Sequence, residues 1–167
     1  MINASADDQN INFAIAKNES LSLYKHLDAM EKIEDESLLI DLIKTSNEPD
    51  FQVKTIKRLN KSTYENDSAI QDILIGILKD NKGYETINAM QYITDKKLVF
   101  EYILIYLKWE NNVIELNGAD MRDLDKLLRK IPKSHPDINQ EDRKVARDAI
   151  NSAISNHDLC GRTRGPM

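Results

Sequence analysis

The chain has 167 residues, 41% of them hydrophobic and 31% charged, a composition typical of one folded domain and too apolar for a disordered chain. The formal net charge of −5 disfavours a nucleic-acid partner, because such binding depends mainly on positive charge that neutralises phosphate. The single cysteine, Cys160, excludes an internal disulfide and a cysteine-cluster metal site. No apolar run reaches the length of a membrane span, so we expect no membrane contact.

The N-terminal residues 1–18 are polar, rich in asparagine and weakly patterned, and we expect a weakly ordered segment there. The triplet Ala4-Ser5-Ala6, followed by Asp7 and Asp8, is similar to the remains of a small-residue signal cleavage site. No basic start and no apolar stretch of a signal peptide precede it. We therefore expect a cytoplasmic protein, with a periplasmic protein exported after signal removal as the alternative.

Residues 19–156 carry apolar side chains at helical spacing and predict a single all-α domain. In the first half Ser20 is the expected cap of the first helix, and Asp67 or Ser68 that of the fourth. A turn is expected at 47–50, a break at 62–66, and the end of the fourth helix at 81–83. The four expected helices cover 20–33, 38–43, 53–59 and 70–78.

The second half predicts helices over 84–94, 98–109, 121–131 and 145–154, with a loop at 110–118 and a flexible tail at 157–167. Pro132 should end the seventh helix. Because the sixth helix is apolar around most of its circumference, we expect it to lie centrally. The residues expected to be buried in the central helices are Ile73, Leu74, Ile77, Phe100, Ile103, Leu104 and Leu107. In the final helix the apolar face is expected to consist of Val145, Ala146, Ala149, Ile150, Ala153 and Ile154.

Two segments sixty residues apart are similar to each other. Leu27-Asp28-Ala29-Met30 matches Ile87-Asn88-Ala89-Met90, and in the same register Asp35 matches Asp95. At half that offset Ile40, Ile70 and Phe100 align, as do Ile43, Ile73 and Ile103. The chain thus repeats roughly every thirty residues, one helix pair per unit, and a pair that cannot bury its apolar faces alone must stack on its neighbours.

This pattern of short antiparallel pairs, with an aspartate at the turn between helices, resembles the HEAT and armadillo-type helical repeats over about residues 20–110. The unit is shorter than the usual HEAT repeat and lacks its proline and arginine. The resemblance implies a small right-handed α-superhelix that binds macromolecules and carries no chemistry. The alternative is a plain helical bundle whose self-similarity is accidental.

The side chains that could support catalysis or bind a metal are scattered along the chain. We therefore expect no enzymatic activity, no bound metal and no cofactor. Cys160 lies in a Gly- and Arg-rich tail, without a shaped site. His26 falls on a helix face beside apolar residues and is expected to be half-buried, and no pair of histidines has the spacing of two zinc ligands on one helix face. The carboxylates of Asp120, Asp123 and Asp125 suit a helix start, where negative charge complements the helix dipole.

The acidic charge of the chain is confined to its first third. Residues 1–50 contain eleven Asp and Glu against four Lys and Arg, whereas 51–110 and 111–167 each carry one excess positive charge. If several of these carboxylates share one surface, they would steer a basic partner toward it. The candidate partner-binding residues are Glu31, Glu34, Asp35, Glu36 and Asp41. The alternative is an ordinary solvated surface.

The combined observations favour a non-catalytic protein-binding module. In its sharper form this is an acidic inhibitor that occludes a basic partner protein, similar in this respect to the bacterial immunity proteins that inhibit nuclease toxins. The alternatives are a general adaptor and a nucleic-acid-binding helical repeat that resembles the alkyl-purine glycosylases, for which only Lys54, Lys57, Arg58 and Lys61 supply a basic groove. A hydrolase with buried carboxylates is a further alternative without a supporting motif.

Overall fold

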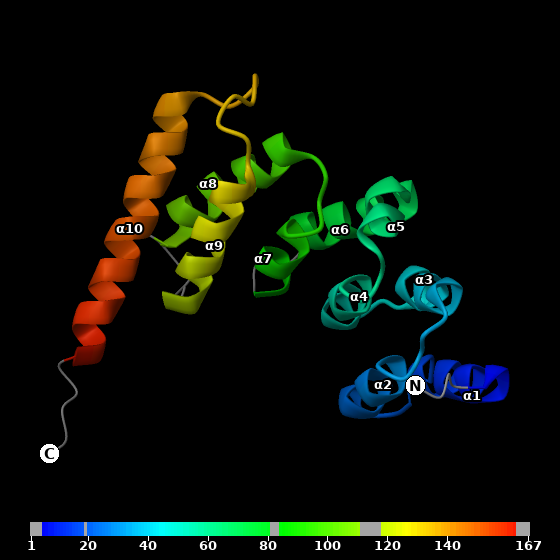
Figure 1. The fold of residues 1–167 in the computed structure, drawn as a ribbon. Coiled ribbons are helices and arrows are strands. Elements are labelled where there is room, and N and C mark those ends of the chain that lie inside the picture. Colours follow the sequence, from blue (N-terminus) through cyan, green and yellow to red (C-terminus); the bar gives the residue numbers. More distant parts are fainter. Residues whose placement is uncertain (1–4, 19, 81–83, 111–117, 163–167) are drawn as a thin grey trace, which may run out of the picture. The chain divides into compact units, whose positions relative to one another are not determined.

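The computed structural model describes residues 5–18, 20–80, 84–110 and 118–162, and within these ranges it contains ten α-helices and no strand (Figure 1). The prediction of an all-α fold is confirmed. The chain divides into two compact units, Met1–Tyr92 and Ile93–Met167. Helical periodicity shows which face of a helix is apolar but not which other helix covers that face, so it does not reveal this division.

The first helix, α1 (Ala6–Ala16), lies in the segment that was expected to be weakly ordered. Ser5 and Asp8 form a reciprocal capping box, in which each side chain accepts a hydrogen bond from the backbone N–H of the other. Such a box satisfies amide groups that a helix leaves unpaired at its start. The Ser5 to Asp8 stretch therefore acts as a helix start, and Gln9 and Ala16 are buried.

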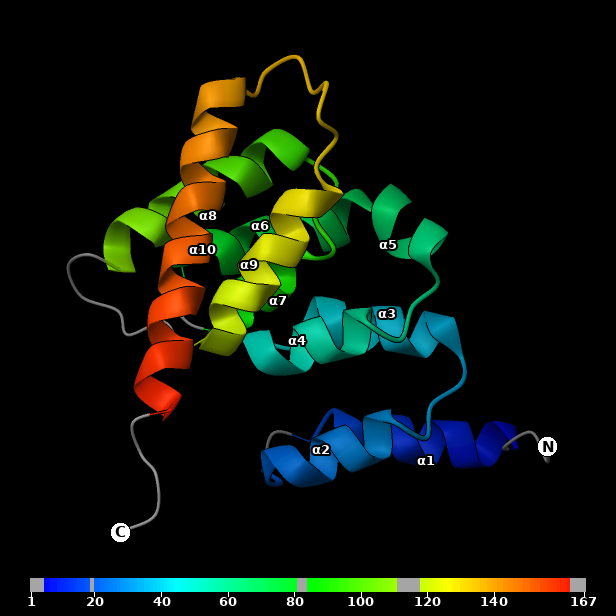
Figure 2. The ribbon, with the colours of Figure 1, turned by 60° about the vertical axis from the view of Figure 1, so that its left-hand side comes forward.

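Unit 1 is built from helix pairs. α1 packs on α2 (Leu23–Met30), α3 (Glu36–Thr45) on α4 (Pro49–Ile56), and α6 (Ser68–Asp80) on α7 (Tyr84–Met90) and on the short α5 (Lys61–Asn66). Between pairs, α1, α3 and α6 contact one another in succession, and so do α2, α4 and α7. The members of the first two pairs lie side by side in Figures 1 and 2. Each pair therefore covers an apolar face of the next.

An aspartate caps the helix that opens each of three segments. Asp35, Asp67 and Asp95 precede α3, α6 and α8 (Lys96–Glu110), and the Oδ1 atom of each accepts a hydrogen bond from a backbone N–H in the first turn. The donor–acceptor distances are 2.8, 2.9 and 3.0 Å. Asp67 was one of the two predicted caps of the fourth helix, and this prediction is confirmed.

The helices α2, α4 and α7 end in the same turn. In each, the backbone N–H two residues beyond the helix donates to the carbonyl three residues before it, at 3.0–3.1 Å. The next residue in each copy is a buried aliphatic side chain, Ile33, Leu59 or Ile93. The sixty-residue match between Met30 and Met90 therefore coincides with helix ends at equivalent positions.

The thirty-residue register is less regular than the sixty-residue one. Ile43 and Ile103 are buried whereas Ile73 is half-buried, so the middle copy is displaced. Its aspartate cap lies thirty-two residues after Asp35 and twenty-eight before Asp95. The segment between α4 and α6, which was predicted as a break, contains the additional short helix α5. The corresponding segments of the other two copies contain no helix, so the middle copy is longer there. Pro49, expected in a turn, instead opens α4, since proline fits the first helical turn, which has no use for its missing N–H.

Unit 2 consists of α8, α9 (Gly118–Lys130) and α10 (Gln140–Arg162), each packed against the other two. The expected loop at 110–118 lies mostly outside the described residues, as do the expected helix end at 81–83 and residues 163–167 of the tail. The helix α10 starts earlier than expected and extends through residues 157–162, which were expected to be a flexible tail.

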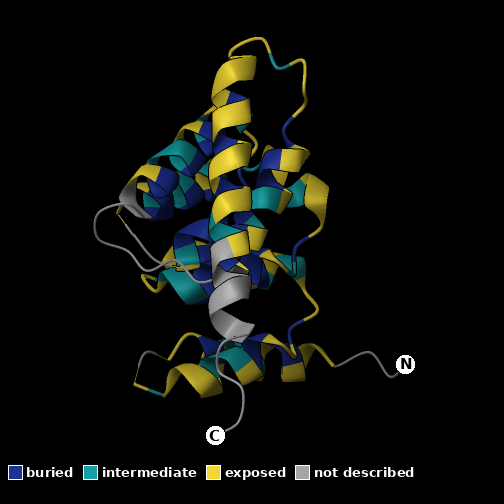
Figure 3. Ribbon diagram, turned by 90° about the vertical axis from the view of Figure 1, so that its left-hand side faces the viewer, coloured by how far each residue is buried: buried dark blue, intermediate teal, exposed yellow. Residues whose placement is uncertain are grey.

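The predicted core is confirmed except at two positions. Leu74, Ile77, Phe100, Ile103 and Leu107 are buried, while Ile73 and Leu104 are half-buried. In α10 the buried residues recur at Arg143, Ala146 and Ile150, so Val145 and Ala149 are exposed rather than packed. Figure 3 shows this exposed side of α10. Within the described ranges, none of the helices combines the length and the apolar character that a membrane crossing requires.

Candidate binding groove

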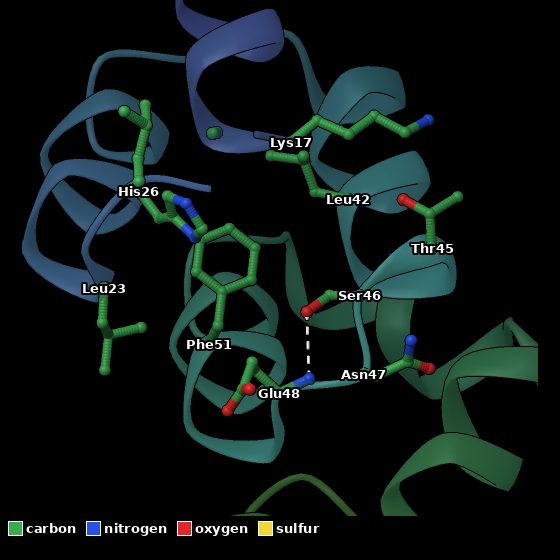
Figure 4. A pocket seen from close by; sticks show the side chains of 11 residues that line it. Lys17, Leu23, His26, Leu42, Thr45, Ser46, Asn47, Glu48 and Phe51 are labelled. Carbon is green, nitrogen blue, oxygen red and sulfur yellow. Dashed lines mark hydrogen bonds between the residues drawn. The ribbon is translucent and has the colours of Figure 1, made fainter. Parts of the chain in front are cut away.

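An open groove lies in unit 1, where the first two helix pairs meet (Figure 4). The end of α1 and the start of α2 form one wall, and the end of α3 and the start of α4 form the other. Its volume is about 490 Å³, within the range of known ligand sites. The lining residues are Ala16, Lys17, Leu21, Leu23, His26, Leu42, Thr45, Ser46, Asn47, Glu48 and Phe51.

The bottom of the groove is apolar and firmly held. Phe51 and Leu42 are buried, and the ring of His26 packs edge-on against Phe51 with the ring centres 6.1 Å apart. The His26 Nε2 atom forms a hydrogen bond with the carbonyl of Asn18, which connects α2 to the segment that leaves α1. Figure 4 shows these two rings side by side. His26 is thus a half-buried packing residue, as predicted.

The rim of the groove is polar, with both signs of charge. Lys17 forms an ion pair with Asp41 at 3.0 Å, and its ammonium lies 5.2 Å from the centre of the Phe13 ring. On the other wall, the backbone N–H of Glu48 donates to the Ser46 hydroxyl, which fixes the link into α4. The Glu48 side chain is exposed and forms no ion pair within the described part of the chain. A cation that enters the groove therefore meets an uncompensated carboxylate.

Exposed apolar side chains concentrate on the first helix pair. Among the described residues, Ile11, Ile15, Leu23 and Tyr24 of α1 and α2 make up four of the six exposed large hydrophobic residues. Leu23, at 44% exposure, lines the groove, and Tyr24 beside it is 78% exposed. Apolar side chains grouped in this way mark an interaction surface more often than single scattered ones do.

Two of the predicted partner-binding carboxylates hold the local structure together. Asp35 caps α3, and the hydroxyl and the backbone N–H of Ser37 lower its pKa. Glu36 accepts hydrogen bonds from the Asn60 backbone N–H and the Thr63 hydroxyl, which connect α3 to the start of α5. The Asn60 bond is the largest cause of a lowered pKa at Glu36. Both carboxylates are therefore ionised at neutral pH.

The other three predicted residues differ in their surroundings. Asp41 is half-buried in the ion pair with Lys17, and its position five residues after Glu36 places it on a different face of α3. Glu31 and Glu34 lie in the turn between α2 and α3, exposed and without an ion pair among the described residues. The structure thus places Glu31, Glu34, Asp35 and Glu36 in one short stretch around this turn, and Asp41 apart from them.

The basic residues considered for nucleic acid are largely engaged elsewhere. Lys54 pairs with Asp50 and Lys61 with Glu65, both on their own helices. Arg58 donates to the carbonyls of Met30 and Ile33 at 2.6 and 2.8 Å, which holds the end of α2. Of the four, only Lys57 has no such partner within the described ranges. Because three of the four cations are used in these internal contacts, the proposed basic groove for nucleic acid loses its main support.

A metal site is not formed by the described residues, in which no three His, Cys, Asp or Glu side chains come together. Asp120 lies in the first turn of α9, as predicted from the helix dipole. Asp123 and Asp125 instead pair with Lys126 and Arg129, each at 2.7 Å. The side chains of His157 and Cys160 lie outside the described set.

The groove was not predicted from the sequence, because its walls come from four consecutive helices whose packing against one another helical periodicity does not specify. The signal that was available is the apolar Leu21, Leu23 and Tyr24, which interrupt an otherwise polar connection. Comparison of the chain with protein-family models, with curated proteins and with solved structures gives no match in any of the three.

Proposed function

We propose that the chain is a non-catalytic protein-binding module, an acidic inhibitor of the immunity type that occludes a basic partner protein. One observation carries this proposal: exposed apolar side chains concentrate on the first helix pair, beside an open groove, in the acidic unit. Residues 1–92 contain sixteen Asp and Glu against ten Lys and Arg, whereas residues 93–167 contain twelve against thirteen. Apolar contact surface and negative field therefore belong to the same unit.

The two features act at different distances. The charges of Glu31, Glu34, Asp35 and Glu36 act beyond contact range and raise the encounter rate with a basic surface. The capping role of Asp35 does not diminish this effect, because its lowered pKa keeps it charged. At contact, the groove takes an apolar side chain or the stem of a Lys or Arg whose cation reaches Glu48. Leu23 and Tyr24 supply the apolar area that holds the complex together.

The resemblance to HEAT and armadillo-type repeats belongs to the same proposal. It is supported by the recurring aspartate caps and the recurring turn after α2, α4 and α7. Stacked helix pairs present side chains from successive units on a continuous surface, which suits a macromolecular partner better than a small substrate. A nucleic acid is a poorer candidate, because the basic residues of α4 and α5 are used in internal contacts.

The test is affinity capture from extract of the native host, followed by identification of the bound proteins. We expect a basic protein to be captured by the wild type and lost by the variant Leu23→Ser/Tyr24→Ser. The matched control is Tyr84→Ser/Val145→Ser, which removes two other exposed apolar side chains, at 54% and 55% exposure, and should capture as the wild type does. Equal capture by both variants, or an acidic partner, would contradict the proposal.

A further inference from the structure

A second cavity lies in unit 2, where α9 ends and α10 begins. It has a volume of about 380 Å³ and is lined by Leu128, Arg129, Ile131, Lys133, Arg143 and Arg147. Four of these six residues are cationic, and within the described part of the chain no acidic side chain lines the cavity. The volume is in the range of small-molecule sites. None of these residues lines the groove in unit 1.

Arg143 is the unusual member of this set, because its side chain is buried with only 4% exposure. Two of its nitrogens donate to the carbonyls of Ile131 and Pro132, at 2.9 and 2.7 Å, and so hold the end of α9. The third nitrogen, Nε, is buried and has no partner among the described residues. The guanidinium pairs with no carboxylate in these ranges.

A structural role at the helix end accounts for the two carbonyl contacts but not for the buried charge. Arg58 makes the same kind of contact to the end of α2, yet that residue is only half-buried. A guanidinium removed from water without a counter-ion is costly. An anion in the cavity beside Arg143 would compensate this charge.

The neighbouring cations add to the positive charge of the cavity. Arg129 is neutralised by Asp125, through an Nε–Oδ2 contact of 2.7 Å. Lys133 and Arg147 are exposed and pair with no carboxylate within the described ranges. With Arg143, three uncompensated positive charges therefore converge on one small cavity from α10 and from the link before it.

We propose that this cavity binds the phosphate group of a small molecule. Guanidinium groups bind phosphate through paired, charge-assisted hydrogen bonds, and Lys133 adds a compact charge. Leu128 and Ile131 are buried beneath the cavity, at 0% and 2% exposure, so the aliphatic stems of the exposed Lys133 and Arg147 offer the contact for the organic part of a phosphate ester. A nucleic acid fits less well, because unit 2 has nearly balanced charge and so lacks the net positive charge that usually drives phosphate-backbone binding.

The test is a titration of the full chain with inorganic phosphate and with phenyl phosphate, followed by amide NMR at constant ionic strength. We expect saturable shifts of residues near 128–147, and a phosphate-dependent rise in melting temperature, because only the folded state binds. Tighter binding of phenyl phosphate would identify a phosphate ester as the ligand class, and equal binding would identify free phosphate. Absence of saturable shifts with both probes would overturn the proposal.

Paired variants separate a site from a general charge effect. Lys133→Gln/Arg147→Gln removes two cations that line the cavity, and we expect about tenfold weaker binding. Lys130→Gln/Lys144→Gln removes two exposed cations of α9 and α10 that do not line the cavity, and this variant should bind as the wild type does. The NMR spectra report whether each variant is folded. Equal weakening in both variants would show that the anion merely follows net charge, and the proposal would fail.

Discussion

At the scale of single residues, Asp67 connects one helix pair to the next. Its carboxylate caps α6 through the N–H groups of Ala69 and Ile70, and it pairs with Lys44 of α3 at 2.8 Å. The hydrogen bond from Lys44 is the first cause of a pKa below the ordinary value of 3.8. One carboxylate thus joins a local cap to a contact between helices.

The lowered pKa of Asp67 gives a pH dependence of stability with a definite sign. A carboxyl group whose pKa is lower in the folded state stabilises it above the unfolded pKa of about 3.9, and this contribution disappears as the pH falls through the folded pKa. We expect Asp67→Asn to lower the melting temperature at pH 7, and the difference from the wild type to shrink as the pH falls through the folded pKa of Asp67. Melting temperatures of both proteins, measured by thermal unfolding from pH 7 into the acid range, test this prediction. Asp72→Asn, an exposed carboxylate on the same helix, is the control.

Some of these residue roles could be predicted from the sequence. The cap at Asp67 and the half-buried state of His26 could be predicted, because both follow from position relative to a helix face or end. The role of Glu36 could not, since its partners Asn60 and Thr63 lie twenty-four or more residues away. The sequence does not distinguish a carboxylate that holds two elements together from one that is only solvated.

At the scale of elements, helix existence was predicted better than helix bounds. Of the ten helices, α1 and α5 were missed, α1 because its apolar residues do not form one clear face and α5 because it is only six residues long. The final helix, α10, was placed with too wide an apolar face, because alanine at positions such as 149 packs or faces water with little energetic difference. Caps and turns set the bounds that periodicity leaves open.

The helix α8 gives a quantitative test of packing. Phe100 is 4% exposed, whereas Leu104, one turn later, is half-buried. We expect Phe100→Ala to reduce the free energy of unfolding by about 3–5 kcal/mol and Leu104→Ala by less than about 2 kcal/mol, because only the first leaves a cavity closed to water. Chemical denaturation of both variants measures this difference. Equal losses would show that the burial along α8 is assigned incorrectly.

At the scale of the whole molecule, charge divides with the two units. The acid excess predicted in the first third belongs to unit 1, and unit 2 is nearly neutral. The distribution of charge along the chain could thus be predicted from the sequence, because it requires only a count of the charged residues in each part. The groove and the cationic cavity could not be predicted from the sequence. Each is lined by side chains from several elements, and the sequence pattern does not show how those elements pack together.

We propose that the acidic surface of unit 1 attracts a basic protein, and association kinetics with the captured partner test this proposal most directly. Glu31→Lys/Glu34→Lys reverses two exposed charges that form no ion pair among the described residues, and Glu101→Lys/Asp148→Lys reverses two exposed charges in unit 2. We expect the first variant to associate about tenfold more slowly at low salt, with a flatter salt dependence and little change in dissociation rate. The second should associate nearly as fast as the wild type. Equal association rates and equal salt slopes for the two variants would contradict the account.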